Sequence, residues 1–192
     1  MKVGLFFGSF NPIHLGHMAI ANYIIEFTEM DQLWFIISPH NPLKKKRTLL
    51  ADYHRLELVQ RAIGNDMNMR ASDIEFSMPK PSYTIDTLAW LTDKFPGKEF
   101  SLIMGSDQLA HFHKWKNYAE IMNLYHRYVY PRSNVDNDNL PFMENATLVN
   151  APIIEISSSF IRSAIKKGKD VRHFLAREVW EYIDEMNFYR KV

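Results

Sequence analysis

The chain has 192 residues, 46% of them hydrophobic and 14% aromatic, which is enough to bury the core of one domain of ordinary size. Its formal net charge of +1 lacks the basic excess of duplex-DNA binders, so any site for a polyanion must be local. The absence of cysteine excludes disulfides and thiolate metal sites. No apolar run approaches the ~20 residues of a membrane span. We therefore expect a cytoplasmic protein without a nucleic-acid or membrane partner, and a homo-oligomer remains open.

Apolar segments alternate with amphipathic ones along the first half of the chain. Short apolar runs predict strands at residues 3–7, 33–37 and 73–76. Apolar residues at helical spacing predict helices at residues 14–28, 53–63 and 84–95, with Asp52 as the cap of the second. The polar and basic segment 38–50 is typical of a loop.

The second half continues the alternation. Strands are expected at residues 100–104, 125–130 and 146–149, with a polar loop at 132–144. Helices are expected after Ser106 and at residues 158–167 and 177–186. This order favours an α/β fold, in which a parallel sheet carries helices on both faces. We expect one domain, residues 1–192, with a small helical C-terminal subregion at about 157–192.

The most informative segment follows the first strand. It reads Gly8-Ser9-Phe10-Asn11-Pro12-Ile13-His14-Leu15-Gly16-His17. Ligands of open α/β sheets bind at the carboxyl ends of the strands, where the free N–H groups of a following helix attract anions. His14 and His17 are three residues apart and share a helix face, which Gly16 keeps open. The segment therefore predicts a phosphate site with two imidazole donors.

The histidine pair has other interpretations. A histidine near a helix start is often only a structural cap. The pair is also compatible with half of a metal site, but no third ligand lies nearby in the sequence. The segment is neither a Walker A loop nor a GxGxxG fingerprint.

A second anion cradle is predicted near the C-terminus. The segment reads Ile156-Ser157-Ser158-Ser159-Phe160-Ile161-Arg162. Serines before an apolar periodic run are helix caps, and an arginine one turn into the helix can grip phosphate with two parallel hydrogen bonds. A plain capped helix is the alternative.

Together the two segments resemble the signatures of the HxGH nucleotidylyltransferases. The resemblance implies a Rossmann-like doubly wound sheet, with the phosphates of ATP held between the two motifs. It implies His14, His17 and Arg162 as catalytic residues. The residues it implies for ATP binding are Gly8, Ser9, Phe10, His14, Gly16, His17, Ser157, Ser158 and Arg162.

Three further segments resemble one subfamily, the bacterial nicotinate mononucleotide adenylyltransferases. They are 81–88, the Gly105-Ser106-Asp107 string with Trp115, and the tail 168–175 with its terminal Phe188-Tyr189. Trp115 could stack on a cationic pyridinium ring, and the helix start at Tyr83 and Thr84 could receive a carboxylate. The residues implied for acceptor binding are Lys44, Tyr83, Thr84, Gly105, Asp107 and Trp115.

The resemblance implies transfer of AMP from ATP to nicotinate mononucleotide, which yields nicotinate adenine dinucleotide and pyrophosphate in NAD biosynthesis. An in-line attack without a covalent intermediate is expected, because the acceptor phosphate is already an anionic nucleophile. Mg²⁺ would bridge phosphate oxygens without a dedicated protein site. Lys116 stands where related enzymes often carry an aromatic residue. Nicotinamide mononucleotide therefore stays open as the acceptor. Phosphopantetheine as the acceptor and a non-catalytic nucleotide-binding protein are further alternatives.

Overall fold

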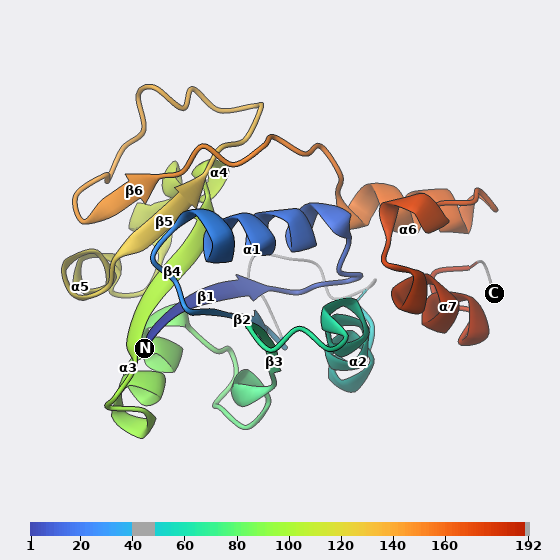
Figure 1. Ribbon diagram of the computed structural model, residues 1–192, viewed down its shortest axis with the longest axis horizontal. Coiled ribbons are helices and arrows are strands. Elements are labelled where there is room, and N and C mark those ends of the chain that lie inside the picture. The colour runs from blue at the N-terminus through green and yellow to red at the C-terminus, as the bar shows by residue number, and fades with distance from the viewer. Residues whose placement is uncertain (40–48, 191–192) are drawn as a thin grey trace.

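A parallel sheet forms the centre of the molecule in the computed structural model, which describes residues 1–39 and 49–190 (Figure 1). Within these residues the sheet has six strands in the order β3-β2-β1-β4-β5-β6, and every neighbouring pair is parallel. The strands are β1 Lys2–Gly8, β2 Gln32–Ile37, β3 Met69–Ser72, β4 Glu99–Gly105, β5 Arg127–Tyr130 and β6 Ala146–Leu148. The order reverses at β1, which places a topological switch point between β1 and β4.

Helices cover both faces of this sheet. They are α1 Leu15–Phe27, α2 Asp52–Ile63, α3 Thr84–Lys94, α4 Ser106–Leu109, α5 Tyr118–Leu124, α6 Ser158–Lys166 and α7 Arg177–Glu185. Successive strand residues point to opposite faces, so Phe6 packs in the core with α1, α2, α6 and α7, whereas Leu5 packs in the core with α3, α4 and α5. The expected Rossmann-like α/β fold is therefore confirmed.

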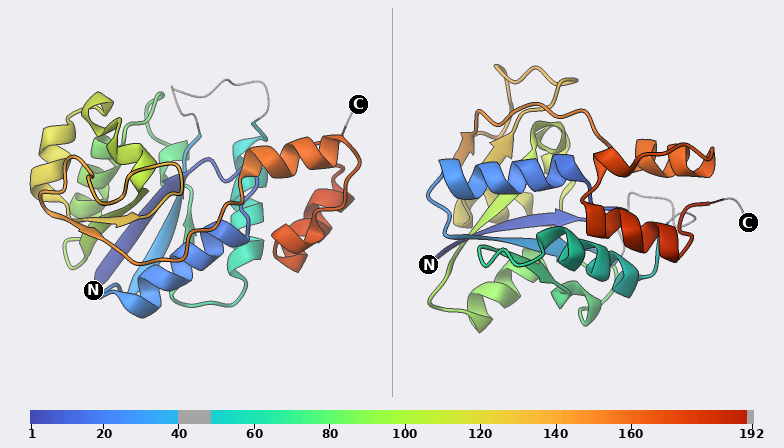
Figure 2. Two further views of the ribbon diagram at one scale, coloured as in Figure 1. Left: turned by 90° about the horizontal axis from the view of Figure 1, so that it is seen from above. Right: turned by 45° about the vertical axis from the view of Figure 1, so that its right-hand side comes forward.

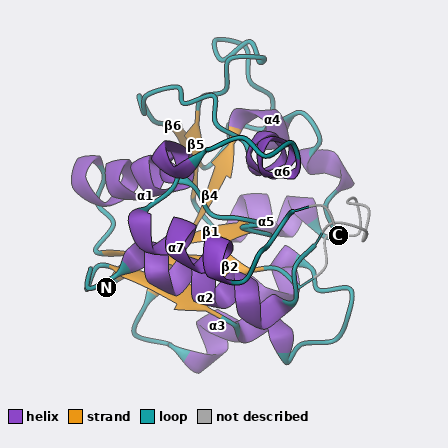
Figure 3. Ribbon diagram, turned by 90° about the vertical axis from the view of Figure 1, so that its right-hand side faces the viewer, coloured by secondary structure: helices purple, strands orange, loops and turns teal. Residues whose placement is uncertain are grey.

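The C-terminal helices lie beyond the sheet rather than over its middle. Figures 1 and 2 show α6 and α7 side by side at the end toward which β1 runs. Seen from that end in Figure 3, α7 lies next to α2, against which it packs. The chain thus returns its last helices to the edge where ligands of this fold class bind.

One predicted strand, at residues 73–76, was wrong. The strand is Met69–Ser72, which pairs with β2 as an edge strand, and Ile74–Phe76 forms a 3₁₀ turn instead. An edge strand needs little apolar character, so the neighbouring Ile-Glu-Phe run gave the stronger signal. The turn buries Glu75, whose side chain is bonded to Thr87 of α3.

Two helix details also differ from the sequence prediction. Ala51, not Asp52, is the N-cap of α2, and the Asp52 carboxylate instead accepts a hydrogen bond from Arg55 at 2.6 Å. The helix Tyr118–Leu124 was not predicted separately; it starts after Asn117, which has a left-handed φ of 52°. In the described residues, no helix is long and apolar enough to cross a membrane.

Candidate active site

The loop between β1 and α1 is packed tightly against its own side chains. A Cβ at Gly8 would lie 2.8 Å from the ring of Phe10, so glycine is needed for the ring to fit. Phe10 has a positive φ of 43° and is 2% exposed. Its ring belongs to the core, so the prediction that Phe10 binds ATP can concern only its backbone.

His14 and His17 come together at the start of α1. His14 is the N-cap, and the two rings stack with centroids 3.8 Å apart. The His14 backbone N–H donates to Nδ1 of His17 at 3.3 Å. A Cβ at Gly16 would approach Nδ1 of His14 to 3.1 Å, so this glycine makes room for the imidazole. The structure confirms the prediction that the two imidazoles lie on one face of the helix.

The buried position of His14 determines its charge. The ring is 6% exposed, and burial, helped by the positive charge of Arg132, lowers its pKa to about 4. The imidazole is therefore neutral at pH 7. A neutral imidazole can still donate one hydrogen bond, so the group would act as a hydrogen-bond donor rather than as a cation.

Arg132 lines a pocket with the two histidines, in a segment for which the sequence predicts only a polar loop. It lies just after β5, with Nε 3.7 Å from the Asp107 carboxylate. One pocket joins it to His14 and His17, and an adjacent pocket joins it to Asp107 and Ser157. Its position after the carboxyl end of a strand was the available signal.

The second motif contacts the first directly. Ser157 caps α6 by accepting from the Phe160 N–H at 3.2 Å. Ser158 Oγ donates to the carbonyl of Pro12 at 2.8 Å, and Arg162 Nη1 donates to the carbonyl of Asn11 at 2.7 Å. Segments from opposite ends of the chain therefore form one site.

The predicted acceptor residues lie at the starts of α3 and α4. Tyr83 is the N-cap of α3 and Thr84 its first residue, so free backbone N–H groups are available there. Asp107 is exposed in α4, and a Cβ at Gly105 would overlap its carboxylate. Trp115 is half-buried and packs against Phe112.

Lys116 connects two of the acceptor segments. Its ammonium group is 2.9 Å from a carboxylate oxygen of Asp86 in α3, and 4.7 Å from the ring centroid of Tyr83. The residue that departs from the subfamily pattern thus places a positive charge at the start of α3. Lys44, also predicted for the acceptor, lies outside the described residues.

A buried carboxylate supports the acceptor side. Glu75 is 2% exposed, and burial raises its pKa above the usual value. Its oxygens accept from Thr87 Oγ1 at 2.7 Å and from Ser82 Oγ at 3.0 Å. The start of α3 is therefore tied to the turn that follows β3. The sequence gives no sign of this role for Glu75, because the Ile-Glu-Phe run predicts a strand.

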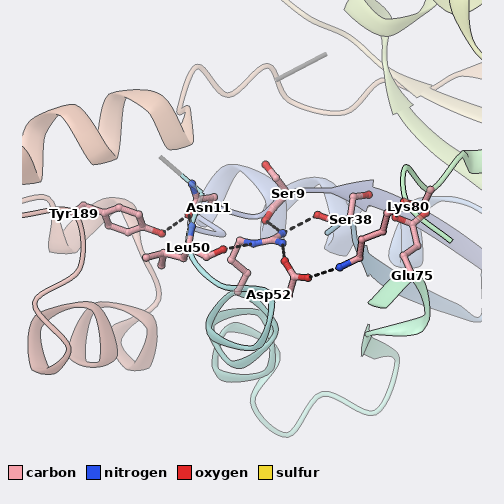
Figure 4. A network of polar contacts seen from close by, with 10 residues as sticks. Ser9, Asn11, Ser38, Leu50, Asp52, Glu75, Lys80 and Tyr189 are labelled. Carbon is pink, nitrogen blue, oxygen red and sulfur yellow. Dashed lines mark hydrogen bonds and ion pairs between the residues drawn. The ribbon is translucent and has the colours of Figure 1, made fainter. Parts of the chain in front are cut away.

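A buried arginine supports the predicted phosphate side, and Figure 4 labels four of its partners, Ser9, Ser38, Leu50 and Asp52. Arg55 is fully buried and donates to the carbonyls of Ser9 at 2.7 Å, Ser38 at 2.9 Å and Leu50 at 3.1 Å. Its remaining bond goes to Asp52. Arg55 therefore ties the loop after β1 to both ends of the β2–α2 connection, a role that no sequence motif indicated.

The comparisons with known proteins identify the family of the chain. A family described as cytidylyltransferase-like matches residues 5–164. Two relatives, from Flavobacterium psychrophilum and Cytophaga hutchinsonii, are each named a probable nicotinate-nucleotide adenylyltransferase. The first is 53% identical over 100% of both chains, and the second 48% identical over 98% of both.

The fold also has solved counterparts. The Plasmodium falciparum nicotinic acid mononucleotide adenylyltransferase, solved in complex with NaAD, matches with a TM-score of 0.82 at 21% identity, over 98% of this chain and 97% of that one. At this identity the likeness supports the fold alone. The family match covers most of this chain, so the chain belongs to the cytidylyltransferase-like family.

Proposed function

We propose that the protein is an adenylyltransferase of NAD biosynthesis, which transfers AMP from ATP to nicotinate mononucleotide and releases pyrophosphate. The observation that carries the proposal is the direct contact of the two phosphate motifs, through Ser158 with Pro12 and Arg162 with Asn11. The names of the full-length relatives support the choice of reaction. The cytoplasm is the proposed location, on the basis of the cysteine-free sequence.

The chemistry needs positioning more than proton transfer. The 5′-phosphate of the acceptor attacks the α-phosphorus of ATP in line, and pyrophosphate leaves. His14 and His17 donate to the α- and β-phosphates, where charge grows in the transition state. Arg162 holds the β/γ end with the N–H groups that are not bonded to Asn11, and Ser158, whose hydroxyl donates to Pro12, holds it through its backbone N–H at the start of α6. Magnesium enters as part of the MgATP substrate, and the described residues hold no cluster of three or more His, Asp or Glu arranged for a metal.

The acceptor occupies the other half of the site. The free N–H groups at the start of α3, with Tyr83 and Thr84, receive the nicotinate carboxylate. Trp115 stacks on the pyridinium ring, and Asp107 accepts from the ribose hydroxyls. Lys44 would contact a phosphate. The free N–H groups at the start of α3 favour the carboxylate of nicotinate over the neutral amide of nicotinamide, with the ammonium of Lys116, ion-paired to Asp86, beside Tyr83.

The test is pyrophosphate release with MgATP, measured in parallel with nicotinate mononucleotide, nicotinamide mononucleotide and phosphopantetheine. We expect kcat/KM to be at least about tenfold higher with the nicotinate ester, the factor that one charge-assisted hydrogen bond supplies. Preference for another acceptor would discard the acceptor assignment and keep the ATP site. No release with any acceptor would leave the non-catalytic alternative.

A further inference from the structure

The C-terminal tail reaches into the first phosphate loop. The hydroxyl of Tyr189 donates to Oδ1 of Asn11 at 2.8 Å, across 178 residues of sequence (Figure 4). The same oxygen accepts from the backbone N–H of Leu50 at 3.3 Å. Asn11 is 3% exposed, so these bonds form away from bulk water. The tail thus contacts the loop that leads to His14.

The tail is held in a conformation that a tyrosine does not adopt readily. Tyr189 has a φ of 63°, in the left-handed region that disfavours bulky side chains. Such conformations persist where the surrounding structure fixes them, and they cluster at functional sites. Here Phe188 packs edge-on against His54 of α2, with ring centroids 4.6 Å apart. The packing of Phe188 and the Asn11 bond together fix residues 188 and 189.

The bond to Asn11 belongs to a wider arrangement around the loop. Three backbone carbonyls are bonded to side chains from elsewhere: Ser9 to Arg55, Asn11 to Arg162 and Pro12 to Ser158. A carbonyl oxygen turned toward a phosphate would repel it, whereas a backbone N–H attracts it. Donors from α2 and α6 therefore fix the directions in which these carbonyls point. Tyr189 fixes the side chain of the residue at the middle of this loop.

We infer that Tyr189 is a positioning residue for adenylyl transfer, which acts through Asn11 on the loop between β1 and α1. The inference rests on the proposed function, because it concerns the same reaction. It extends the candidate site to Tyr189, which follows α7.

The main test is Tyr189→Phe, with Tyr182→Phe as the matched control. Tyr182 lies in α7 and its hydroxyl is bonded to Nδ1 of His54 at 2.9 Å, so it also joins the C-terminal subregion to α2 but does not touch the loop. We expect Tyr189→Phe to lower kcat about five- to tenfold, as expected for one lost hydrogen bond. KM for ATP and for the acceptor should stay within about twofold. Tyr182→Phe should keep kcat within about twofold.

A double-mutant cycle separates action through Asn11 from a general loosening of the tail. If Tyr189 acts through Asn11, the Asn11→Ala and Tyr189→Phe double variant has the kcat of Asn11→Ala alone. Independent effects that multiply would overturn the inference. So would equal losses of kcat in Tyr189→Phe and Tyr182→Phe, since these would reflect the tail's stability only.

A readout without catalysis keeps the inference testable if the proposed reaction fails. Hydrogen exchange of the backbone amides at residues 9–17 should be faster in Tyr189→Phe than in Tyr182→Phe, measured under conditions where both remain folded. Unchanged exchange in this segment would overturn the role of Tyr189, whatever the wild-type activity is. If the wild type is inactive but exchange is faster in Tyr189→Phe, the proposed function is wrong and the role of Tyr189 in holding the loop is kept.

Discussion

The two halves of the site are built in different ways. On the ATP side, buried or half-buried donors from α2 and α6, such as Arg55 and Arg162, are bonded to backbone carbonyls of one loop. On the acceptor side, an exposed ion pair joins Lys116 to Asp86, and the Asp107 carboxylate is exposed. Backbone-directed bonds constrain the position of a loop, whereas exposed side-chain pairs contribute little to stability. Buried Glu75 still fixes the backbone at the start of α3, so the contrast concerns the exposed side chains. Under the proposed function, the reaction chemistry would rest on the backbone-directed bonds and acceptor choice on the exposed side chains.

The largest effect is expected at His17. Removing one preorganised donor to the developing charge costs about 10²–10³-fold in kcat. His17→Ala should therefore lower kcat by about this factor and leave the affinity for MgATP less affected, since the phosphates keep their other donors. Steady-state kinetics and ATP titration check this. A kcat within about tenfold of wild type would contradict the role of His17.

The second effect concerns the stability of the rigid half. Arg55→Met leaves the carbonyls of Ser9 and Ser38 without their donor, so the free energy of unfolding should fall by about 2–4 kcal/mol. Urea unfolding measures the change. The matched control is Arg61→Met on the same helix, whose partner Glu57 is partly exposed and whose loss should cost under about 1 kcal/mol. Equal losses in both variants would remove the distinction between buried and exposed contacts.

The third effect is a pH dependence from His14. Its pKa is lowered to about 4 in the folded protein, so the unfolded state binds more protons between pH 4 and 6.5. The neutral His14 should therefore contribute about 3 kcal/mol to the free energy of unfolding above pH 6.5. This contribution should be lost as the pH falls toward 4. Unfolding of wild type and His14→Gln across this range checks the slope. If both lose stability equally, His14 is not the cause.

The smallest effect is expected at Lys116. Lys116→Met removes an exposed charge beside Tyr83, so KM for nicotinate mononucleotide should rise about two- to fivefold while KM for ATP stays unchanged. Lys94→Met, at the other end of α3, is the control and should change neither constant. If KM for ATP also changed in Lys116→Met, the two halves of the site would not act separately.

The sequence predicted the parts of the molecule that local patterns determine. Continuous apolar runs marked the central strands, because both faces of a parallel sheet are buried. The edge strand Met69–Ser72 was missed, since it carries Arg70 and Ser72 and has no such run. The two phosphate motifs were found from their residues, and the structure places them in contact.

The supporting residues could not be predicted in the same way. Arg55, Glu75 and Tyr189 are bonded to residues distant in sequence, so their roles depend on tertiary contacts that no local pattern encodes. Arg132 had a weak signal in its position after a strand. The assignment of residues 1–192 to one domain, and the roles of the site residues, stay predictions.

The most direct measurement of the central claim is the product itself. Mass spectrometry of a reaction with MgATP and nicotinate mononucleotide should find nicotinate adenine dinucleotide, with one pyrophosphate released for each dinucleotide and no adenylylated protein. Free AMP without a dinucleotide, or AMP bound covalently to the chain, would contradict the direct transfer between two bound substrates.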